Sequence, residues 1–458
     1  MKNAANMLLN VKKHRQKNRV RAYILGFVGA GAMLFSALHA GAQTASELAR
    51  LFNGSEVMSS HFVGFKLYDP RAKEVLYEQD ADKYFTPASN TKLYTVYAAL
   101  TLLGDSIPAL RYVERGDSLV FWGTGDPTLL NPAFGESDVL DFLRSSGKQL
   151  YYATGNYTGN PFGRGWEWND YAYYYQPEIH AMPIYGNVVN FKAASNRGIQ
   201  ATPSYFAPYL QLDYTMRAPR FTIQRDHHDN TFRYNGQTVP ATLNRWAPFK
   251  TSDRLLAALL SDTLRRQVQL TRMAVPDDAR FVYSHPLDTV LRAMMLPSDN
   301  HIAEQLLLVC AAMHLGAELN ADSIRRYIVD EYLDDLPQRP EWHDGSGLSR
   351  YNLSSPASMV RLLEKLQEVV PDEERLLALF PAGGVSGTLE RVYPTRNGRP
   401  FVWAKTGTLS NNHNQSGYLI TKSGRKLIYS FMNNNYVRPV AEIRQEMARI
   451  ITAIHDNY

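Results

Sequence analysis

Cysteine is scarce in this sequence: Cys310 is the only one among 458 residues. A chain with one cysteine forms no internal disulfide bond, so its stability has to come from a packed core. Cys310 itself lies in the apolar, helix-like run 302–313, and we predict that it is a small, buried hydrophobic residue. Low-complexity and highly charged tracts are also missing, and a hydrophobic content of 45% is ordinary for a globular protein.

Net positive charge is lacking outside the N-terminus. The first 42 residues carry seven lysines and arginines and no acidic residue, and subtracting these seven charges from the formal net charge of +5 leaves −2. The remainder has no basic stripe and no nucleic-acid-reading motif. Nucleic acid is therefore excluded as an expected partner.

Residues 1–42 have the order of a secretory signal peptide. Basic residues come first, an apolar stretch covers 22–38, and Ala40-Gly41-Ala42 follows. We predict export and cleavage before Gln43. An uncleaved membrane anchor is the alternative, because the apolar stretch is near the lower length limit for spanning a bilayer.

A Gly-x-Ser-x-Gly elbow is absent as well, which disfavours an α/β-hydrolase. Three stretches instead place a serine three residues before a lysine: Ser89-Asn90-Thr91-Lys92, Ser145-Ser146-Gly147-Lys148 and Ser423-Gly424-Arg425-Lys426. Only the first opens a long apolar helical pattern. The offset stacks the two side chains on a helix, and a lysine whose charged form is disfavoured by burial can accept the serine proton.

Two further stretches carry polar groups at suitable places. Ser298-Asp299-Asn300 separates two apolar helical patterns and could point side chains into a cleft, although an ordinary helix N-cap is an equally good interpretation. Lys405-Thr406-Gly407-Thr408 ends a strand-like run, where Gly407 permits close approach of a ligand and the lysine and hydroxyls suit a carboxylate. Alone, it would be interpreted as an exposed strand before a turn.

Ser-x-x-Lys, Ser-Asp-Asn and Lys-Thr-Gly in this order form the motif set of β-lactamases and penicillin-binding proteins. The chain resembles the low-molecular-mass class C penicillin-binding proteins, the D-alanyl-D-alanine carboxypeptidase/endopeptidase family, over nearly all of its mature length. Further segments that carry this resemblance are Gly125-Asp126-Pro127, 166–170, 344–350, 384–389 and Ser416-Gly417-Tyr418.

The resemblance implies an α+β fold of the serine β-lactamase/DD-peptidase type, with an antiparallel five-stranded sheet flanked by helices and the first and last helices packed together. The family inserts extra domains between its first two motifs, and the strand-like runs with Gly and Pro punctuation at about 112–278 indicate that the insertion here is β-rich. We therefore expect a signal peptide at 1–42, a penicillin-binding (DD-peptidase) domain at 43–112 and 279–458, and inserted β-rich subdomains at 113–278.

The mechanism that the resemblance implies is acyl transfer without a metal ion or other cofactor. Ser89 would attack the carbonyl of the penultimate D-alanine with Lys92 as base. Ser298 would relay a proton to the leaving amine, and Asn300 would hold the substrate amide. Lys405 would supply positive potential, the hydroxyls of Thr406 and Thr408 would bind the terminal carboxylate beside Gly407, and the backbone N–H groups of Ser89 and Thr408 would form the oxyanion hole.

Three other segments allow more than one interpretation. The polar stretch 411–415 departs from the apolar residues that the family usually has there; His413 could titrate near the cleft, but we expect it to lie in a solvated turn. Asp226-His227-His228-Asp229 is interpreted as a polar hairpin tip rather than a metal site, because successive residues do not converge on one ion. The aromatic cluster 171–175 could line a groove, but we expect it to pack inside the insertion.

The favoured function is a periplasmic serine DD-peptidase that acts on peptidoglycan stem peptides or their cross-links and is acylated by β-lactams. A secreted β-lactamase or esterase on the same scaffold is the alternative, and rapid nitrocefin turnover would favour it. A non-enzymatic wall-binding module is a third. Carboxypeptidase or endopeptidase preference, peripheral membrane association and oligomeric state stay open.

Overall fold

The structure, a computed structural model, describes residues 46–135, 138–195, 198–316 and 318–458. The predicted signal peptide at 1–42 lies outside the described residues. Within those four ranges, no helix has both the length and the apolar character needed to cross a membrane.

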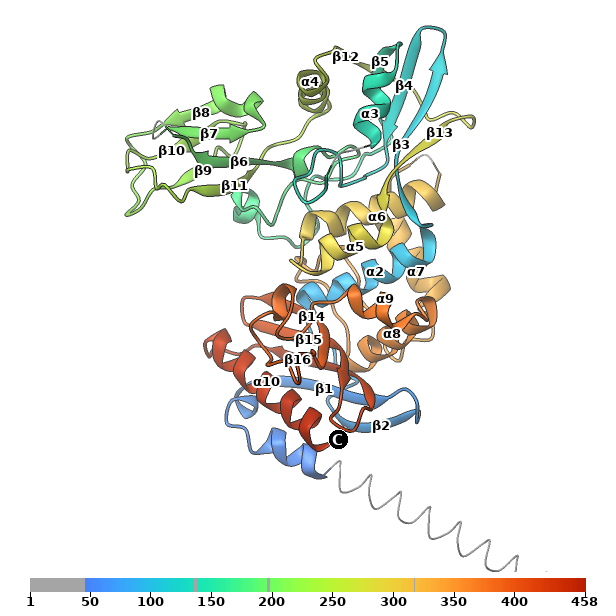
Figure 1. Ribbon diagram of the computed structural model, residues 1–458, viewed down its shortest axis with the longest axis vertical. Coiled ribbons are helices and arrows are strands. Elements are labelled where there is room, and N and C mark those ends of the chain that lie inside the picture. Colours follow the sequence, from blue (N-terminus) through green and yellow to red (C-terminus); the bar gives the residue numbers. More distant parts are fainter. Residues whose placement is uncertain (1–45, 136–137, 196–197, 317) are drawn as a thin grey trace, which may run out of the picture.

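An antiparallel five-stranded sheet forms the centre of the half of the molecule that holds the C-terminus (Figure 1). It is assembled from both ends of the chain, because the two N-terminal strands pair with the three C-terminal ones. This confirms the predicted α+β fold. The strand order is β14 (Val402–Leu409), β15 (Asn412–Ile420), β16 (Lys426–Asn434), β1 (Phe62–Asp69) and β2 (Glu74–Gln79), which leaves β14 at an edge.

One face of this sheet is covered by helical residues 46–53 and by α10 (Val440–Asn457). Leu48 and Phe52 from the first helix share a core with Ile450 of α10 and with Phe431 of the sheet. The predicted packing of the first and last helices against each other is confirmed, and Figure 1 shows them side by side.

The opposite face packs against a group of helices. The apolar helical pattern after Ser89 forms α2, which contacts α6 and α8 in one buried core. Cys310 lies inside α6 and is fully buried, as predicted, and burial raises the pKa of its thiol to about 12. The helices on this side are α2 (Lys92–Leu102), α5 (Leu287–Met295), α6 (Asn300–His314), α7 (Ala321–Tyr332), α8 (Pro356–Val369) and α9 (Glu373–Ala378).

Between α2 and α5 the chain forms a separate β-rich region (Figure 1). Its largest sheet is β12 (Val268–Arg272), β5 (Gln149–Thr154), β4 (Ser118–Gly123), β3 (Ser106–Arg115) and β13 (Arg280–Pro286), with α3 (Asp138–Ser145) and α4 (Asp253–Leu264) beside it. Two three-stranded sheets follow: β11 (Asn244–Pro248), β6 (Val188–Ala193) and β7 (Ile199–Thr202); and β8 (Leu210–Leu212), β10 (Phe232–Tyr234) and β9 (Ile223–Arg225).

The expected boundaries of the insertion, 112/113 and 278/279, stay a prediction. The first falls within β3 and the second just before β13, and these two strands pair with each other in the inserted sheet. The 226–229 segment joins β9 to β10 as a polar turn with exposed His227 and His228, as predicted.

The expectation that His413 lies in a solvated turn is wrong. The turn ends at the exposed Asn411, whereas β15 begins at Asn412 and the polar side chains of 412–415 are buried. Two of these buried side chains form hydrogen bonds to distant residues. Asn414 donates to the Thr86 carbonyl at 2.8 Å, and Gln415 accepts from two tyrosine hydroxyls. Such hydrogen bonds offset the cost of burying polar groups.

Candidate active site

Ser89 lies in the 3-10 turn η2 (Ala88–Thr91), directly ahead of α2. The turn is held by two close backbone approaches. Gly347, at φ +87°, packs against the Ala88 carbonyl, where a Cβ atom would collide. Gly407 of β14 passes so near that a Cβ atom there would lie 2.8 Å from the Ser89 nitrogen. Glycine at both positions therefore lets the edge strand and the 344–350 loop approach the serine.

Lys92 is one turn further on and completely buried. Its Nζ lies 3.1 Å from Ser89 Oγ, 2.6 Å from Asn300 Oδ1 and 2.7 Å from the Ser346 carbonyl oxygen. Three acceptors match the three N–H donors of an ammonium group. A neutral amine would keep two donors for Asn300 and Ser346 and direct its lone pair at Ser89, which is the geometry of a general base.

The charge state of Lys92 is balanced by its surroundings. Burial lowers the pKa of its amine to about 8, while the negative charges of Asp344, Asp299 and Glu304 oppose that shift. The lysine therefore loses its proton much closer to neutral pH than an exposed lysine does. This property suits a group that takes a proton from serine and later returns one.

Ser298-Asp299-Asn300 forms a helix N-cap and also contributes side chains to the site, so both interpretations of its sequence apply. Asp299 caps α6 by accepting a 2.8 Å hydrogen bond from the Ile302 N–H. Ser298 has a positive φ of 65° and accepts a 2.8 Å hydrogen bond from Lys405 Nζ. Asn300 contacts Lys92 on the other side, so the flanking residues of the trio face the two lysines.

Lys405 is buried on β14. Besides Ser298, it contacts the Thr406 carbonyl oxygen at 2.6 Å. Burial, together with the nearby positive charge of Lys92, holds the pKa of Lys405 well below its usual value. The lysine thereby links the edge strand to the Ser298 hydroxyl.

The threonines of β14 project to the opposite side of the strand. Thr406 donates to the Thr388 hydroxyl at 2.8 Å, and the Thr408 hydroxyl lies 2.8 Å from His413 Nδ1. Both line one pocket of about 360 Å³ together with Ser89 and Ser298. The structure thus brings the three predicted motifs into one site, and the catalytic roles of their residues stay predictions.

The 344–350 loop supplies contacts that the sequence analysis did not assign. Glu304 of α6 accepts hydrogen bonds from the Gly345 and Ser346 N–H groups at 2.9 and 2.7 Å, and this holds the Ser346 carbonyl against Lys92. Burial and the adjacent charge of Asp344 raise the pKa of Glu304 to about 7. A backbone acceptor has no side-chain signature, so only the family-like 344–350 motif indicated this loop.

The inserted region also reaches the site. The Tyr175 carbonyl accepts a 2.9 Å hydrogen bond from Asn300 Nδ2, and Trp166 Nε1 donates to Asp344 at 2.9 Å. Our expectation that the aromatic cluster packs inside the insertion is wrong for Tyr173 and Tyr174, which are 45% and 64% exposed.

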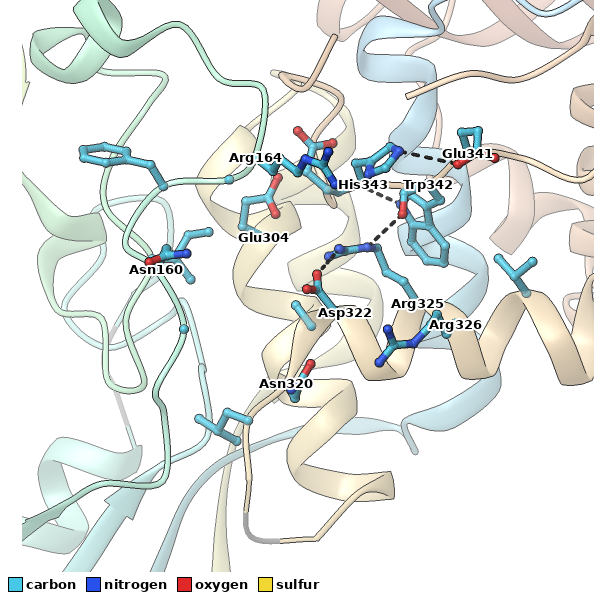
Figure 2. A pocket seen from close by; sticks show the side chains of 18 of the residues that line it. Asn160, Arg164, Glu304, Asn320, Asp322, Arg325, Arg326, Glu341, Trp342 and His343 are labelled. Carbon is cyan, nitrogen blue, oxygen red and sulfur yellow. Dashed lines mark hydrogen bonds and ion pairs between the residues drawn. The ribbon is translucent and has the colours of Figure 1, made fainter. Parts of the chain in front are cut away.

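A second, larger cavity of about 520 Å³ has Glu304 among its lining residues (Figure 2). It is formed between the 157–164 segment of the insertion, α7 and residues 339–344. Figure 2 shows Arg325 bonded to Asp322 and to the Trp342 carbonyl in its wall. No serine or threonine of the three motifs lines this second cavity. The pocket at Ser89 is therefore the candidate reaction site.

Comparison with known proteins defines the class. The model of the D-Ala-D-Ala carboxypeptidase 3 (S13) family matches residues 45–454, so the chain belongs to this family. It is a serine-type D-Ala-D-Ala peptidase with the fold of the penicillin-binding proteins. The predicted family, fold and type of enzyme are confirmed.

Individual relatives agree with this assignment. The D-alanyl-D-alanine carboxypeptidase DacB of Haemophilus influenzae is 25% identical over 453 residues, covering 85% of this chain and 88% of the relative. A D-alanyl-D-alanine carboxypeptidase from an Actinomadura species is 27% identical over 428 residues, covering 82% and 78%. The crystal structure of penicillin binding protein 4 from Haemophilus influenzae has a TM-score of 0.70 and 22% identity, covering 90% of this chain and 99% of that one, which shows a shared fold.

Proposed function

We propose that the residues of the three motifs hydrolyse D-alanyl bonds in peptidoglycan stem peptides, with Ser89 as the nucleophile. These residues are Ser89, Lys92, Ser298, Asn300, Lys405, Thr406, Gly407 and Thr408. The observation that carries this proposal is the triple contact of Lys92 with Ser89, Asn300 and Ser346. It places a buried amine with a lowered pKa within hydrogen-bond distance of a serine hydroxyl in an open pocket.

In the acylation step, Ser89 Oγ attacks the carbonyl carbon of the penultimate D-alanine while Lys92 Nζ accepts the hydroxyl proton. The oxyanion forms between the N–H groups of Ser89 and Thr408, where stabilisation acts only on charge that develops in the transition state. The C–N bond then breaks, and Ser298, held by Lys405, relays to the leaving amine the proton that Lys92 took from Ser89, which returns Lys92 to its neutral form and leaves Ser298 as a hydroxyl.

The rest of the cycle uses the same groups. Thr406 and Thr408 hold the terminal carboxylate of the substrate, and Asn300 holds its amide. Water attacks the ester of Ser89 with Lys92 again as base, which releases the shortened peptide and restores the hydroxyl. A β-lactam acylates Ser89 by the same attack, but its ester leaves slowly.

Release of D-alanine from a peptide ending in D-Ala-D-Ala tests the proposal. We expect purified residues 43–458 to release D-alanine, Ser89→Ala to release none, and the matched variants Ser145→Ala and Ser423→Ala to match the wild type. Ser145 ends α3 and Ser423 lies in the turn between β15 and β16, so both keep the Ser-x-x-Lys spacing away from the site. Undiminished release by Ser89→Ala would refute the assignment.

The alternative of a β-lactamase or esterase on this scaffold is separated by nitrocefin. We expect stoichiometric acylation without rapid turnover, whereas fast, sustained hydrolysis by the same preparation would favour the alternative. We also place the enzyme in the periplasm, because the order of residues 1–42 is that of a signal peptide. Fractionation of cells that express the full chain, with N-terminal sequencing of the product, tests export and cleavage before Gln43.

A further inference from the structure

The second cavity, shown in Figure 2, is built from parts of the chain that the proposed reaction does not use. The 157–164 segment of the insertion, α7 and residues 339–344 line it, and it shares no lining residue with the pocket at Ser89. Its volume of about 520 Å³ is within the range of ligand pockets, about 300–1,000 Å³. A ligand bound there would leave the reaction pocket free.

The carboxylates in the lining of this cavity already have partners in the described part of the chain. Asp344 accepts four hydrogen bonds of 2.6 to 2.9 Å. The two oxygens of Glu304 each accept a backbone N–H. Asp322 pairs with Arg325, and Glu341 lies 3.6 Å from a histidine nitrogen. The negative charges of the lining are therefore engaged by groups of the protein itself.

Two arginines of the lining, in contrast, have no carboxylate partner among the described residues. Arg164 belongs to the insertion, and its Cζ lies 5.1 Å from the centroid of the Tyr351 ring. Arg326 belongs to α7 and donates to the Ser323 hydroxyl at 3.3 Å. Both side chains are exposed. Guanidinium groups without a carboxylate partner, beside carboxylates that are engaged, favour an anionic ligand, and a carboxylate matches their planar geometry.

An amide donor and aromatic rings complete the lining. Asn320 caps α7 by accepting the Ser323 N–H at 2.9 Å through Oδ1, which leaves its NH₂ group to donate. Tyr157, Phe162 and Trp342 contribute rings to the wall. A peptide suits this combination, because the rings contact its apolar groups and the donors contact its carbonyl and carboxylate oxygens. An inorganic anion would use the arginines alone.

The cavity lies a short way from the nucleophile. Glu304, which lines it, accepts the Ser346 N–H at 2.7 Å, and the Ser346 carbonyl lies 2.7 Å from Lys92 Nζ. Lys92 Nζ is 3.1 Å from Ser89 Oγ. A substrate that carries several peptides on one polymer can therefore occupy both places at once, and its second contact is then intramolecular.

We propose that this cavity is an accessory site that binds a carboxylate-bearing peptide of the peptidoglycan polymer while another peptide of the same polymer is cleaved at Ser89. The inference rests on the proposed function. Carboxylates of the bound peptide contact Arg164 and Arg326, and no bond forms or breaks in the cavity. Because this contact is the same before and during the reaction, it lowers KM for the polymer and leaves kcat unchanged.

Calorimetric titration of penicillin-acylated protein tests binding, since acylation keeps the reaction pocket occupied. The two probes are N-acetyl-Ala-D-Glu-Ala-D-Ala, which carries two carboxylates, and N-acetyl-Ala-D-Gln-Ala-D-alaninamide, which carries none. We expect a Kd on the order of 0.1–1 mM for the acidic peptide and about fivefold or weaker binding for the neutral one. Inorganic phosphate at the same ionic strength should not displace the acidic peptide.

Arg164→Gln and Arg326→Gln each remove one of the two charges. Arg254→Gln is the matched control, because Arg254 is an exposed arginine on α4 outside the cavity. We expect each of the first two variants to weaken binding of the acidic peptide and to raise KM for purified peptidoglycan about three- to tenfold. Their kcat on the polymer, and their rates of penicillin acylation and of D-alanine release from a short peptide, should stay within about twofold of the wild type.

Three results would overturn the inference: equal binding of the acidic and neutral peptides, complete displacement by phosphate, or variants that lose the same factor on the short peptide as on the polymer. The proposed function fails differently. A wild type that forms no penicillin adduct and releases no D-alanine contradicts both proposals, whereas an acylated wild type that binds neither probe contradicts the accessory site alone.

Discussion

The two lysines beside Ser89 are both buried, yet their surroundings differ in sign. Lys92 lies near the carboxylates of Asp344, Asp299 and Glu304, which limit the fall of its pKa to about 8. The charged neighbour of Lys405 is Lys92 itself, and the pKa of Lys405 is held well below its usual value. Burial alone therefore does not determine the role of a lysine. Acidic neighbours keep Lys92 near the point of losing its proton, which is what general-base catalysis requires.

The contacts of the two lysines differ in the same sense. Lys92 contacts the nucleophile directly, whereas Lys405 contacts Ser298 and the backbone of Thr406. This difference in contacts supports the proposal that Lys92 takes the proton of Ser89, while Lys405 acts on the side of the leaving group.

Replacing each of the two lysines by alanine should give the largest effects on the rate of acylation. We expect Lys92→Ala to lower the rate of acylation by a penicillin about 10³- to 10⁴-fold, the upper part of the range for a general base. Lys405→Ala should lose about 10²-fold, as for one electrostatic contact. Stopped-flow acylation measures both, with thermal unfolding as a check that each variant is folded. Equal losses in the two variants, or a Lys92→Ala rate within tenfold of the wild type, would contradict the different roles proposed for Lys92 and Lys405.

The pH dependence of acylation follows from the lowered pKa of Lys92. Only the neutral amine accepts a proton, so kcat/KM should rise with pH and level off above about pH 8. We expect one ascending limb when acylation is measured between pH 6 and 10. A rate that is flat over this range would show that Lys92 is not the base.

Glu304→Gln should make the surroundings of Lys92 more like those of Lys405. Removing a negative charge that stabilises the ammonium form lowers the pKa of Lys92, so the ascending limb should move to lower pH. Glu341→Gln is the matched control, because Glu341 lines the second cavity and is exposed. A shift to higher pH, or equal shifts in both variants, would contradict the role given to the carboxylate.

How far the sequence predicts this site depends on whether a contact comes from a side chain within a motif. Ser89, Lys92 and Asn300 could be placed together because each belongs to a short motif with a helix beside it. The Ser346 and Tyr175 carbonyls could not, since backbone acceptors are the same in every residue. The 344–350 loop was noted only through its resemblance to the family.

His413 was predicted wrongly for a different reason. Five consecutive polar residues are typical of a loop, and the burial of four of them, 412–415, in β15 depends on partners distant in sequence, such as Thr86 and Tyr393. Local pattern carries no information about those partners. Likewise, the insertion was predicted to be β-rich from its composition, but the pairing of β3 with β13 joins residues about 170 positions apart in the chain.

The smallest predicted effect concerns how the protonation of His413 changes the free energy of unfolding. The folded-state pKa of His413 is about 3, lower than the 6.5 of an exposed histidine, so the unfolded chain binds the proton more readily. Its contribution to stability is therefore fully present above pH 6.5 and is lost as the pH falls from 6.5 toward 3. We expect the loss in unfolding free energy between pH 7 and pH 5 to be about 2 kcal/mol smaller in His413→Asn than in the wild type.

Urea unfolding at the two pH values measures this difference. His227→Asn is the control, since His227 is exposed on the hairpin tip and should leave the wild-type pH dependence unchanged. The same loss in His413→Asn and in the wild type would mean that the imidazole is not held neutral.

The most direct test of the account is the intact mass of purified residues 43–458 after incubation with a penicillin, followed by peptide mapping. The account predicts one adduct per chain, located on Ser89, and no adduct on Ser89→Ala. An adduct on any other serine, or one that persists in Ser89→Ala, would contradict the assignment of Ser89 as the nucleophile that Lys92 activates.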